Sequence, residues 1–187
     1  MVALQIDLEN RKIGDTGNDC LMSVDGTDFQ IPQHGSAFSS HKYNMKSGLR
    51  YEVALCIATG SIVWFNGPFP CGRNPDITIF RIGLLSYLGE GERVEADDGY
   101  IGEAPRHCKI PKYFQGSERE EMMQVVRNRQ ETINKRFKNW GILKQVYRNK
   151  EKIHLHGEVF ACIAVITQVA INNGEKLFDV EYDDDLL

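Results

Sequence analysis

The chain has 187 residues, 42% of them hydrophobic, which is enough to bury the core of one globular domain. Its opening residues lack the unbroken apolar region of a signal peptide, and its longest apolar run, residues 159–171, is shorter than the roughly 20 residues of a membrane-spanning helix, so we expect a soluble intracellular protein without membrane association. The formal net charge of −4 is unevenly distributed: residues 105–152 carry 13 Lys or Arg and 5 Asp or Glu, and this basic segment can face phosphate although the whole chain is acidic.

The cysteines exclude two further classes of protein. Their number is odd, they are widely spread, and no two of them form a CxxC pair, so the sequence encodes neither a disulfide framework nor a zinc site. A reducing intracellular compartment fits this usage best. They are Cys20, Cys56, Cys71, Cys108 and Cys162.

The first half of the chain predicts a strand meander after a polar lead-in segment, residues 1–20. Alternating apolar residues and turn-forming glycines predict three strands, at residues 21–31 (interrupted near Gly26), about 49–58, and 62–65. The proline-rich stretch 67–70 then breaks the chain. Asn74 can cap a helix that has Pro75 at its first position and continues with a helical period to about Leu88.

The second half predicts one strand and two helices. Residues 92–96 read as a short strand that delivers Asp97 and Asp98 to a turn, and residues 101–116 as a loop. Ser117 and Glu120 form a candidate capping box for a helix to about Trp140. Its predicted buried stripe is Met122, Val126, Ile133, Phe137 and Trp140. A final apolar helix, about 153–172, ends at Gly174 and is followed by an acidic tail, residues 175–187.

This order of elements is compatible with a central mixed sheet flanked by helices. Periodicity alone leaves it as one of several α/β or α+β arrangements. Residues 21–174 are expected to form one domain between the lead-in segment and the acidic tail.

Two acids follow predicted strands, where side chains from separate elements can face a common ligand. Asp25 precedes Gly26, and Asp97 ends the fourth strand, although a one-residue shift would present Asp98 instead. Carboxylates in such places can hold the divalent cations that phosphodiester chemistry uses. An Asp before Gly is also common as a turn residue, and that reading stays open for Asp25.

Glu131 is a third candidate acid, on the long helix. Arg127, Glu131, Asn134 and Lys138 lie about 80° to 140° from the apolar stripe and therefore share one flank of the helix. The alternative is that Arg127 and Glu131 form an ordinary i, i+4 ion pair on a solvated face.

Three motifs resemble those of PIF/Harbinger transposases, in the order found in that family. They are Ser23-Val24-Asp25-Gly26-Thr27, Asp97-Asp98-Gly99-Tyr100, and Arg127-Asn128-Arg129-Gln130-Glu131 followed by Lys135, Arg136 and Phe137. The resemblance covers roughly residues 20–170, and Asp97 and Glu131 are 34 positions apart, within the spacing expected for such transposases.

The resemblance implies an α/β, ribonuclease H-like fold and an acid triad, Asp25, Asp97 and Glu131, that binds Mg²⁺ or Mn²⁺. It selects Asp97 over Asp98. It further implies a nuclear enzyme that cuts and joins DNA, with Arg127, Lys135 and Lys138 on the phosphate backbone. A separate DNA-binding partner protein and an oligomer are both compatible with it.

Several residues are left outside the predicted triad. Asp76, in a stretch that resembles the family's Gly-x-x-x-Asp, is explained by the dipole of the helix it begins. His154 and His156 are expected at the surface or as capping residues, and the pair His107-Cys108 lacks an oxyanion-hole signature.

Two alternatives to an active enzyme remain. One is a domesticated, non-catalytic module that binds DNA or protein, and the other is a remnant that has lost its activity. The intact acids favour the enzyme over the non-catalytic module, and a remnant would be expected to be poorly soluble when expressed alone.

Overall fold

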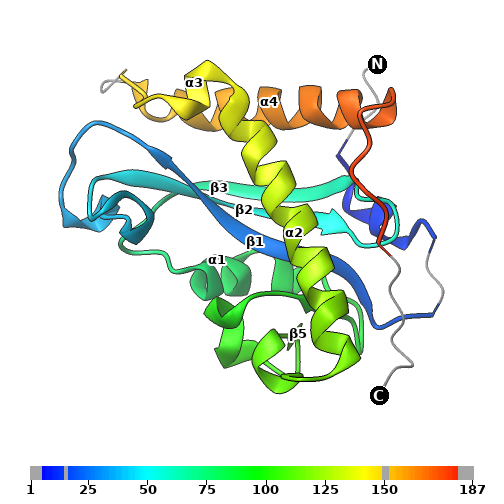
Figure 1. The fold of residues 1–187 in the computed structure, drawn as a ribbon. Coiled ribbons are helices and arrows are strands. Elements are labelled where there is room, and N and C mark those ends of the chain that lie inside the picture. Colours follow the sequence, from blue (N-terminus) through cyan, green and yellow to red (C-terminus); the bar gives the residue numbers. More distant parts are fainter. Residues whose placement is uncertain (1–5, 15–16, 149–151, 181–187) are drawn as a thin grey trace.

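A five-stranded mixed sheet forms the centre of the protein (Figure 1), in a computed structural model that describes residues 6–14, 17–148 and 152–180. The order of the strands across the sheet is β3-β2-β1-β4-β5. The pairs β1–β2 and β2–β3 are antiparallel, and β1–β4 and β4–β5 are parallel. The strands are β1 (Cys20–Gln30), β2 (Gly48–Cys56), β3 (Ile62–Pro70), β4 (Arg93–Glu95) and β5 (Cys108–Lys109).

Helices cover both faces of this sheet, so the chain is an α/β protein as expected. In Figure 1 the long helix α2 runs across the strands, with α4 above them and α1 below. The α-helices are α1 (Asp76–Ile82), α2 (Glu118–Asn139), α3 (Gly141–Lys144) and α4 (Leu155–Asn172). Short 3-10 helices span Leu8–Lys12, Ser36–Phe38, His41–Tyr43, Leu84–Tyr87, Asp98–Glu103 and Pro111–Tyr113.

Alternation along the strands produces two cores, one on each face. The core under α2 and α4 is aromatic: Phe160 stacks on Tyr51 with ring centroids 4.0 Å apart and meets Phe137 edge-on. The core on the α1 face is built on Val24, Ala54 and other residues of β1 to β4, together with Phe80, Leu84 and Tyr100. Both faces of β1 are therefore covered around the position of Asp25.

The first and third strands are longer than predicted. β1 is not interrupted at Gly26, which pairs with Glu52 of β2 in an unbroken register. β3 continues through Pro68 to Pro70, although these prolines were expected to break it. Because β3 is an edge strand, its prolines need not donate to a further neighbour, and a register shift opposite Arg50 to Glu52 accommodates them.

The helices differ from the prediction mainly at their ends. Asn74 does not cap α1: its side chain donates to the Pro70 carbonyl, and Pro75 is the N-cap residue. The helix predicted as far as Leu88 ends at Ile82, since Gly83 departs from helical geometry and a 3-10 turn follows.

The capping box and part of the stripe of α2 were also predicted incorrectly. Ser117 is the N-cap residue, but its hydroxyl donates to the Phe114 carbonyl, and Glu120 accepts instead from the backbone of Gly116. Val126, Ile133 and Phe137 are buried as predicted. Trp140 is 42% exposed because α2 ends just before it.

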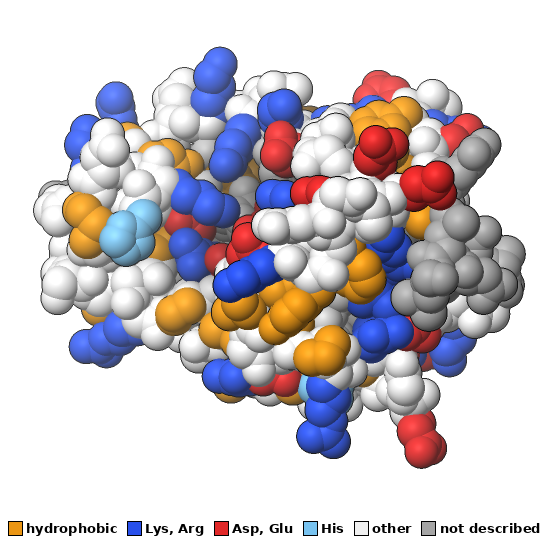
Figure 2. All heavy atoms as spheres, turned by 60° about the horizontal axis from the view of Figure 1, so that its bottom comes forward, with side chains coloured by type: hydrophobic (Ala, Val, Ile, Leu, Met, Phe, Trp, Pro, Cys, Tyr) orange, Lys and Arg blue, Asp and Glu red, His pale blue; other side chains and the backbone are white. Residues whose placement is uncertain are grey.

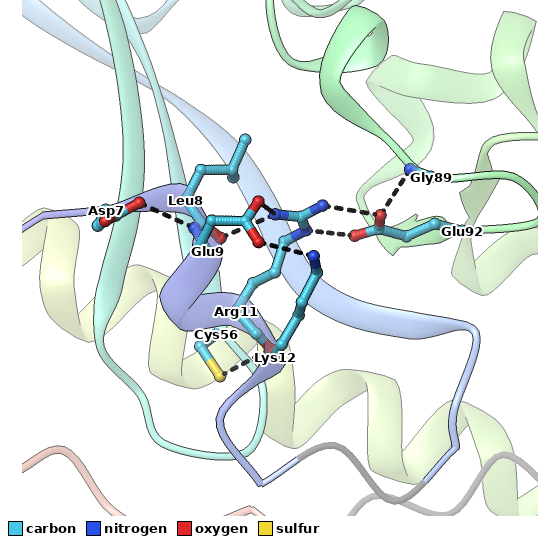
Figure 3. A network of polar contacts seen from close by, with 8 residues as sticks. All are labelled: Asp7, Leu8, Glu9, Arg11, Lys12, Cys56, Gly89 and Glu92. Atoms are coloured by element: carbon cyan, nitrogen blue, oxygen red, sulfur yellow. Dashed lines mark hydrogen bonds and ion pairs between the residues drawn. The ribbon is translucent and has the colours of Figure 1, made fainter.

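The lead-in segment packs against the sheet. Arg11, which is buried, donates its Nε and Nη2 to the two carboxylate oxygens of Glu92 at 2.8 and 3.3 Å (Figure 3). Glu92 in turn accepts from the backbone of Gly89. Residues 6–14 are thereby fixed to the turn that precedes β4. The acidic tail is described only as far as residue 180, and the remaining residues of that prediction, 181–187, lie outside the described part of the chain.

The last helix belongs to the core, as predicted. By length and composition α4 could cross a membrane, but Phe160, Ile163 and Ala164 pack in the core between the sheet and α4. His156, expected at the surface, is buried there, and its Nδ1 lies 2.7 Å from the Tyr51 hydroxyl. The surrounding aromatic rings make this position part of the core.

Burial of His156 predicts a loss of stability in acid. Burial lowers the pKa of His156 from 6.5 to about 4, so between these values the unfolded chain binds a proton that the folded protein does not. The free energy of unfolding should therefore fall by up to about 3 kcal/mol more in the parent than in His156→Gln between pH 7 and pH 4. Urea unfolding across this range measures the difference. His41→Gln, at an exposed position, is the control and should lose as much stability in acid as the parent. If His156→Gln also loses as much stability as the parent between pH 7 and pH 4, the prediction is refuted.

Candidate functional site

A pocket of about 330 Å³ opens where α2 crosses the middle of β1 and the carboxyl end of β4. All three predicted acids and all three predicted phosphate-binding residues line it. The lining residues are Ser23, Val24, Asp25, Lys42, Glu95, Ala96, Asp97, Val126, Arg127, Gln130, Glu131, Asn134, Lys135 and Lys138. Residues from four separate parts of the chain thus meet at one place.

Asp25 is the most firmly held of the acids. Its Oδ1 accepts from the Gly26 backbone at 2.7 Å, and its Oδ2 accepts from the Asn134 side chain on α2 at 2.8 Å. Burial, together with the neighbouring carboxylates Asp97 and Asp76 and against the opposing charge of Lys42, raises the pKa of Asp25 to about 6. Asp25 therefore sits in a place where a positive charge would be stabilised.

Of the two adjacent acids Asp97 and Asp98, the structure places Asp97 at the pocket. Asp97 is half-buried, lines the pocket, and accepts the Gly99 backbone N–H at 2.8 Å as the N-cap of a 3-10 helix. Asp98 is exposed and is not among the lining residues. The strand β4 ends at Glu95, so the two following residues carry Asp97 to the pocket.

Glu131 lies on the pocket rim and is loosely held. Its side chain is 58% exposed, and its Oε2 is 3.9 Å from Lys135 Nζ, a long contact between residues one helical turn apart. Such an exposed pair contributes little to stability. The sequence left open an ion pair between Glu131 and Arg127, but the contact observed is the one between Glu131 and Lys135.

Buried polar contacts fix the orientation of α2 over the pocket. Gln130 accepts from the Ser23 hydroxyl at 2.9 Å and donates to the Val53 carbonyl at 3.0 Å. Near the start of the helix, Arg119 donates to Glu95 at 2.9 Å with both side chains buried. These contacts turn the flank that carries Glu131 and Asn134 toward Asp25.

Positive charge surrounds the acids. Arg127 and Lys138 are half-buried and Lys135 is 76% exposed, and all three project from α2. Lys42, from the connection between β1 and β2, was missed by the sequence analysis because an isolated loop lysine has no signature; its Nζ donates to the Gly26 carbonyl at 2.5 Å. Figure 2 shows Lys and Arg side chains beside Asp and Glu on one face of the molecule, so both charges share that surface.

Asp76 lies beside the pocket although the sequence analysis left it out. A Cβ built on Gly26 would be 1.7 Å from Asp76 Oδ1, so the carboxylate occupies the space that this glycine leaves open. Arg50 Nη1 is 3.4 Å from the same oxygen. The Gly-x-x-x-Asp stretch was the signal that could have found this residue.

The donor atoms at the pocket fit a hard divalent cation. Mg²⁺ and Mn²⁺ take carboxylate oxygens and keep several waters, and each carboxylate oxygen of Asp25 and Asp97 retains a lone pair beyond the hydrogen bond described. Within the described residues no three Asp, Glu, His or Cys side chains already form a metal-binding group. Glu131, loosely held at the rim, would have to turn inward to complete one.

Comparison of the chain with protein-family models, with curated proteins and with solved structures gives no match.

The close approach of Asp76 to Gly26 predicts a coupled effect on stability. In Gly26→Ala the new methyl group would collide with a carboxylate that Arg50 restrains, so we expect a loss of about 2 kcal/mol in the free energy of unfolding. In the Asp76→Ala background the same change should be milder by at least about 1 kcal/mol.

Urea unfolding of the parent, the two single variants and the double variant measures this coupling. Gly35→Ala is the matched control, because a Cβ there would meet no atom within 4 Å and the residue is exposed. Additive effects of Gly26→Ala and Asp76→Ala would contradict the described contact.

Proposed function

We propose that the chain is the catalytic domain of a PIF/Harbinger-like transposase, a metal-dependent endonuclease that cuts DNA and joins the cut end to a target. The observation that carries this proposal is the meeting of Asp25, Asp97 and Glu131, from three separate elements, around one pocket. Two divalent cations held there would activate the attacking oxygen and stabilise the leaving oxygen of a phosphodiester.

The residues of the chain have distinct parts in this proposal. Asp25 and Asp97, both restrained by backbone N–H groups, would fix the cations between the middle of β1 and the end of β4. Glu131 would complete the set from α2. Asn134 holds Asp25 by one of its oxygens and so positions that carboxylate.

The topology supports the same proposal. A mixed sheet with the order β3-β2-β1-β4-β5, in which the first three strands form an antiparallel meander and the last two are parallel to β1, is the arrangement expected of a ribonuclease H-like fold. In it β1 is the central strand and β4 its neighbour, so Asp25, two residues beyond the last β1 residue paired with β4, lies close to Asp97, two residues beyond the end of β4.

Basic side chains around the pocket would bind the DNA backbone. Arg127, Lys135 and Lys138 extend from the same helix as Glu131, and Lys42 faces them from the β1–β2 connection. Burial lowers the pKa of Lys138, whose Nζ lies 5.7 Å from the centre of the Phe29 ring. A phosphate brought to this pocket would meet cations on two sides.

The second candidate function is a non-catalytic, transposase-derived module that binds DNA or protein. The loose hold on Glu131, exposed and 3.9 Å from Lys135, is the observation that favours it. Metal-dependent cleavage separates the two candidates.

Cleavage of a labelled DNA duplex in Mg²⁺ or Mn²⁺ tests the proposal. Asp25→Asn and Glu131→Gln should each nick the duplex at least about a hundredfold more slowly than the parent, since each removes a charged metal ligand and the cations supply several kcal/mol of transition-state stabilisation. The nicking rate of Asp97→Asn should be lower than that of the parent by a similar factor.

Matched controls are available on the same elements. Asp98→Asn and Glu121→Gln remove exposed carboxylates outside the pocket and should nick at the rate of the parent. Nicking by Asp25→Asn and Glu131→Gln at the parental rate would rule out the assignment, and a parent that binds DNA without nicking it would favour the non-catalytic module.

The basic residues predict a salt-dependent affinity for DNA. In Ca²⁺, the double variant Arg127→Gln/Lys135→Gln should bind a short duplex more weakly, with a slope of log affinity against log salt that is shallower by up to about 1.8, because each lost phosphate contact removes about 0.9. Fluorescence anisotropy from low to high salt measures this slope. Lys12→Gln, whose ammonium pairs with Glu9 away from the pocket, is the control; the same slope in double variant and parent would count against this surface.

A further inference from the structure

Asp76 lies beside the pocket, and the proposed triad gives it no part. It is the first residue of α1, and its Oδ1 lies where a Cβ of Gly26 would be. A Cβ built on Gly99 would be 3.8 Å from Asp76 Oδ2 and 2.8 Å from Asp97 Oδ1, so these two oxygens are no farther apart than the sum of those distances. The Asp76 carboxylate therefore lies between the two backbone segments that carry Asp25 and Asp97.

We propose that Asp76 is a fourth carboxylate of this site, whose negative charge adds to those of Asp25 and Asp97 and strengthens the binding of a divalent cation. The inference rests on the proposed metal-dependent function and extends it by one residue. Asp76 would act either as a ligand or through water on the cation, and the added charge is common to both.

The favourable interaction of an aspartate with the N-terminal end of the α1 dipole does not account for where the Asp76 carboxylate lies. The Oδ1 atom is buried and makes no hydrogen bond within the described part of the chain. An aspartate that served only the dipole of α1 could keep its carboxylate in solvent, whereas here Gly26 has no side chain and the carboxylate fills that space. Its contact with Arg50 Nη1 is 3.4 Å long, and a buried carboxylate oxygen without a closer donor is costly unless a further positive group meets it.

Arg50 does not fully neutralise Asp76. Its Nε and Nη2 donate to Asp28 at 2.7 and 3.1 Å, while its contact with Asp76, through Nη1, is longer at 3.4 Å. Asp28 is fully buried, so its negative charge depends on this guanidinium for compensation. Two carboxylates thus share one arginine, and Asp76 has the longer of the contacts with it.

The mutual electrostatics agree with this arrangement. Burial raises the pKa of Asp76, Arg50 and Lys42 oppose that rise, and Asp28 and Asp97 add to it. Asp76 also lies against Gly26, the residue next to Asp25, so the three acids Asp25, Asp76 and Asp97 are gathered at one place. Three acids that repel one another across a short distance gain most from a multivalent cation between them.

Titration of the folded protein with Mn²⁺, followed by calorimetry without DNA, tests the proposal. Asp76→Asn should bind Mn²⁺ at least about tenfold more weakly than the parent, because a unit charge a few ångströms from a divalent cation is lost. Asp98→Asn, which removes an exposed carboxylate from the neighbouring segment, is the matched control and should bind as the parent. A residue that served only to pair with Arg50 would change stability without changing this affinity.

Asp25→Asn separates failure of this inference from failure of the proposed function. If Asp25→Asn binds Mn²⁺ weakly while Asp76→Asn binds it within about twofold of the parent, only the fourth carboxylate is overturned. If Asp25→Asn also binds as the parent, the metal site itself is overturned, and this inference with it.

A second measurement uses the parent protein and does not depend on the folding of any variant. Fe²⁺ in place of Mn²⁺, with ascorbate and peroxide, generates hydroxyl radicals that cut the backbone close to the bound ion. Cuts are expected in three segments, around Asp25, Asp76 and Asp97. Cuts around Asp25 and Asp97 without cuts around Asp76 would overturn the proposal.

Discussion

The amide of Gln130 is the contact on which the geometry of the pocket depends. It joins α2 to two strands at once, accepting from Ser23 of β1 and donating to Val53 of β2, and it is buried. Rotation of the helix would leave these polar atoms buried without partners, which costs about 1–3 kcal/mol for each group. Because side chains four positions apart share a helix face, this constraint also aims Asn134 at Asp25.

The three acids differ in how firmly their side chains are held. Asp25 is held by hydrogen bonds on both oxygens, and Asp97 by one, so their positions are set before any ligand arrives. Glu131 comes from the same helix as Asn134 but points to the rim, where only a long contact with Lys135 restrains it. The pocket thus combines two restrained acids with a third that is exposed and weakly held.

The parts of the fold that the sequence predicted are those with a repeating physical signal. The apolar stripe of α2 identified Val126, Ile133 and Phe137 as buried because one period ran for several turns. The strand β5, only Cys108–Lys109, is too short to show a period. His156 was misplaced for a different reason: an imidazole is equally compatible with surface and core, and the rings of Phe29, Tyr51 and Tyr147 that surround it in the fold decide.

The site was predicted in its acids but not in what surrounds them, and Gly26 shows why. Within the sequence, a glycine after Asp25 reads as a break in a strand, yet β1 continues through it. Its lack of a side chain is matched instead to Asp76, fifty positions away, whose carboxylate fills the space. A glycine that is required because it lacks a Cβ gives no sign, in the sequence around it, of the distant residue that fills the space. The contact that explains the motif exists only once α1 has packed against the sheet, so tertiary structure, and not the pattern, identifies the carboxylate beside the triad.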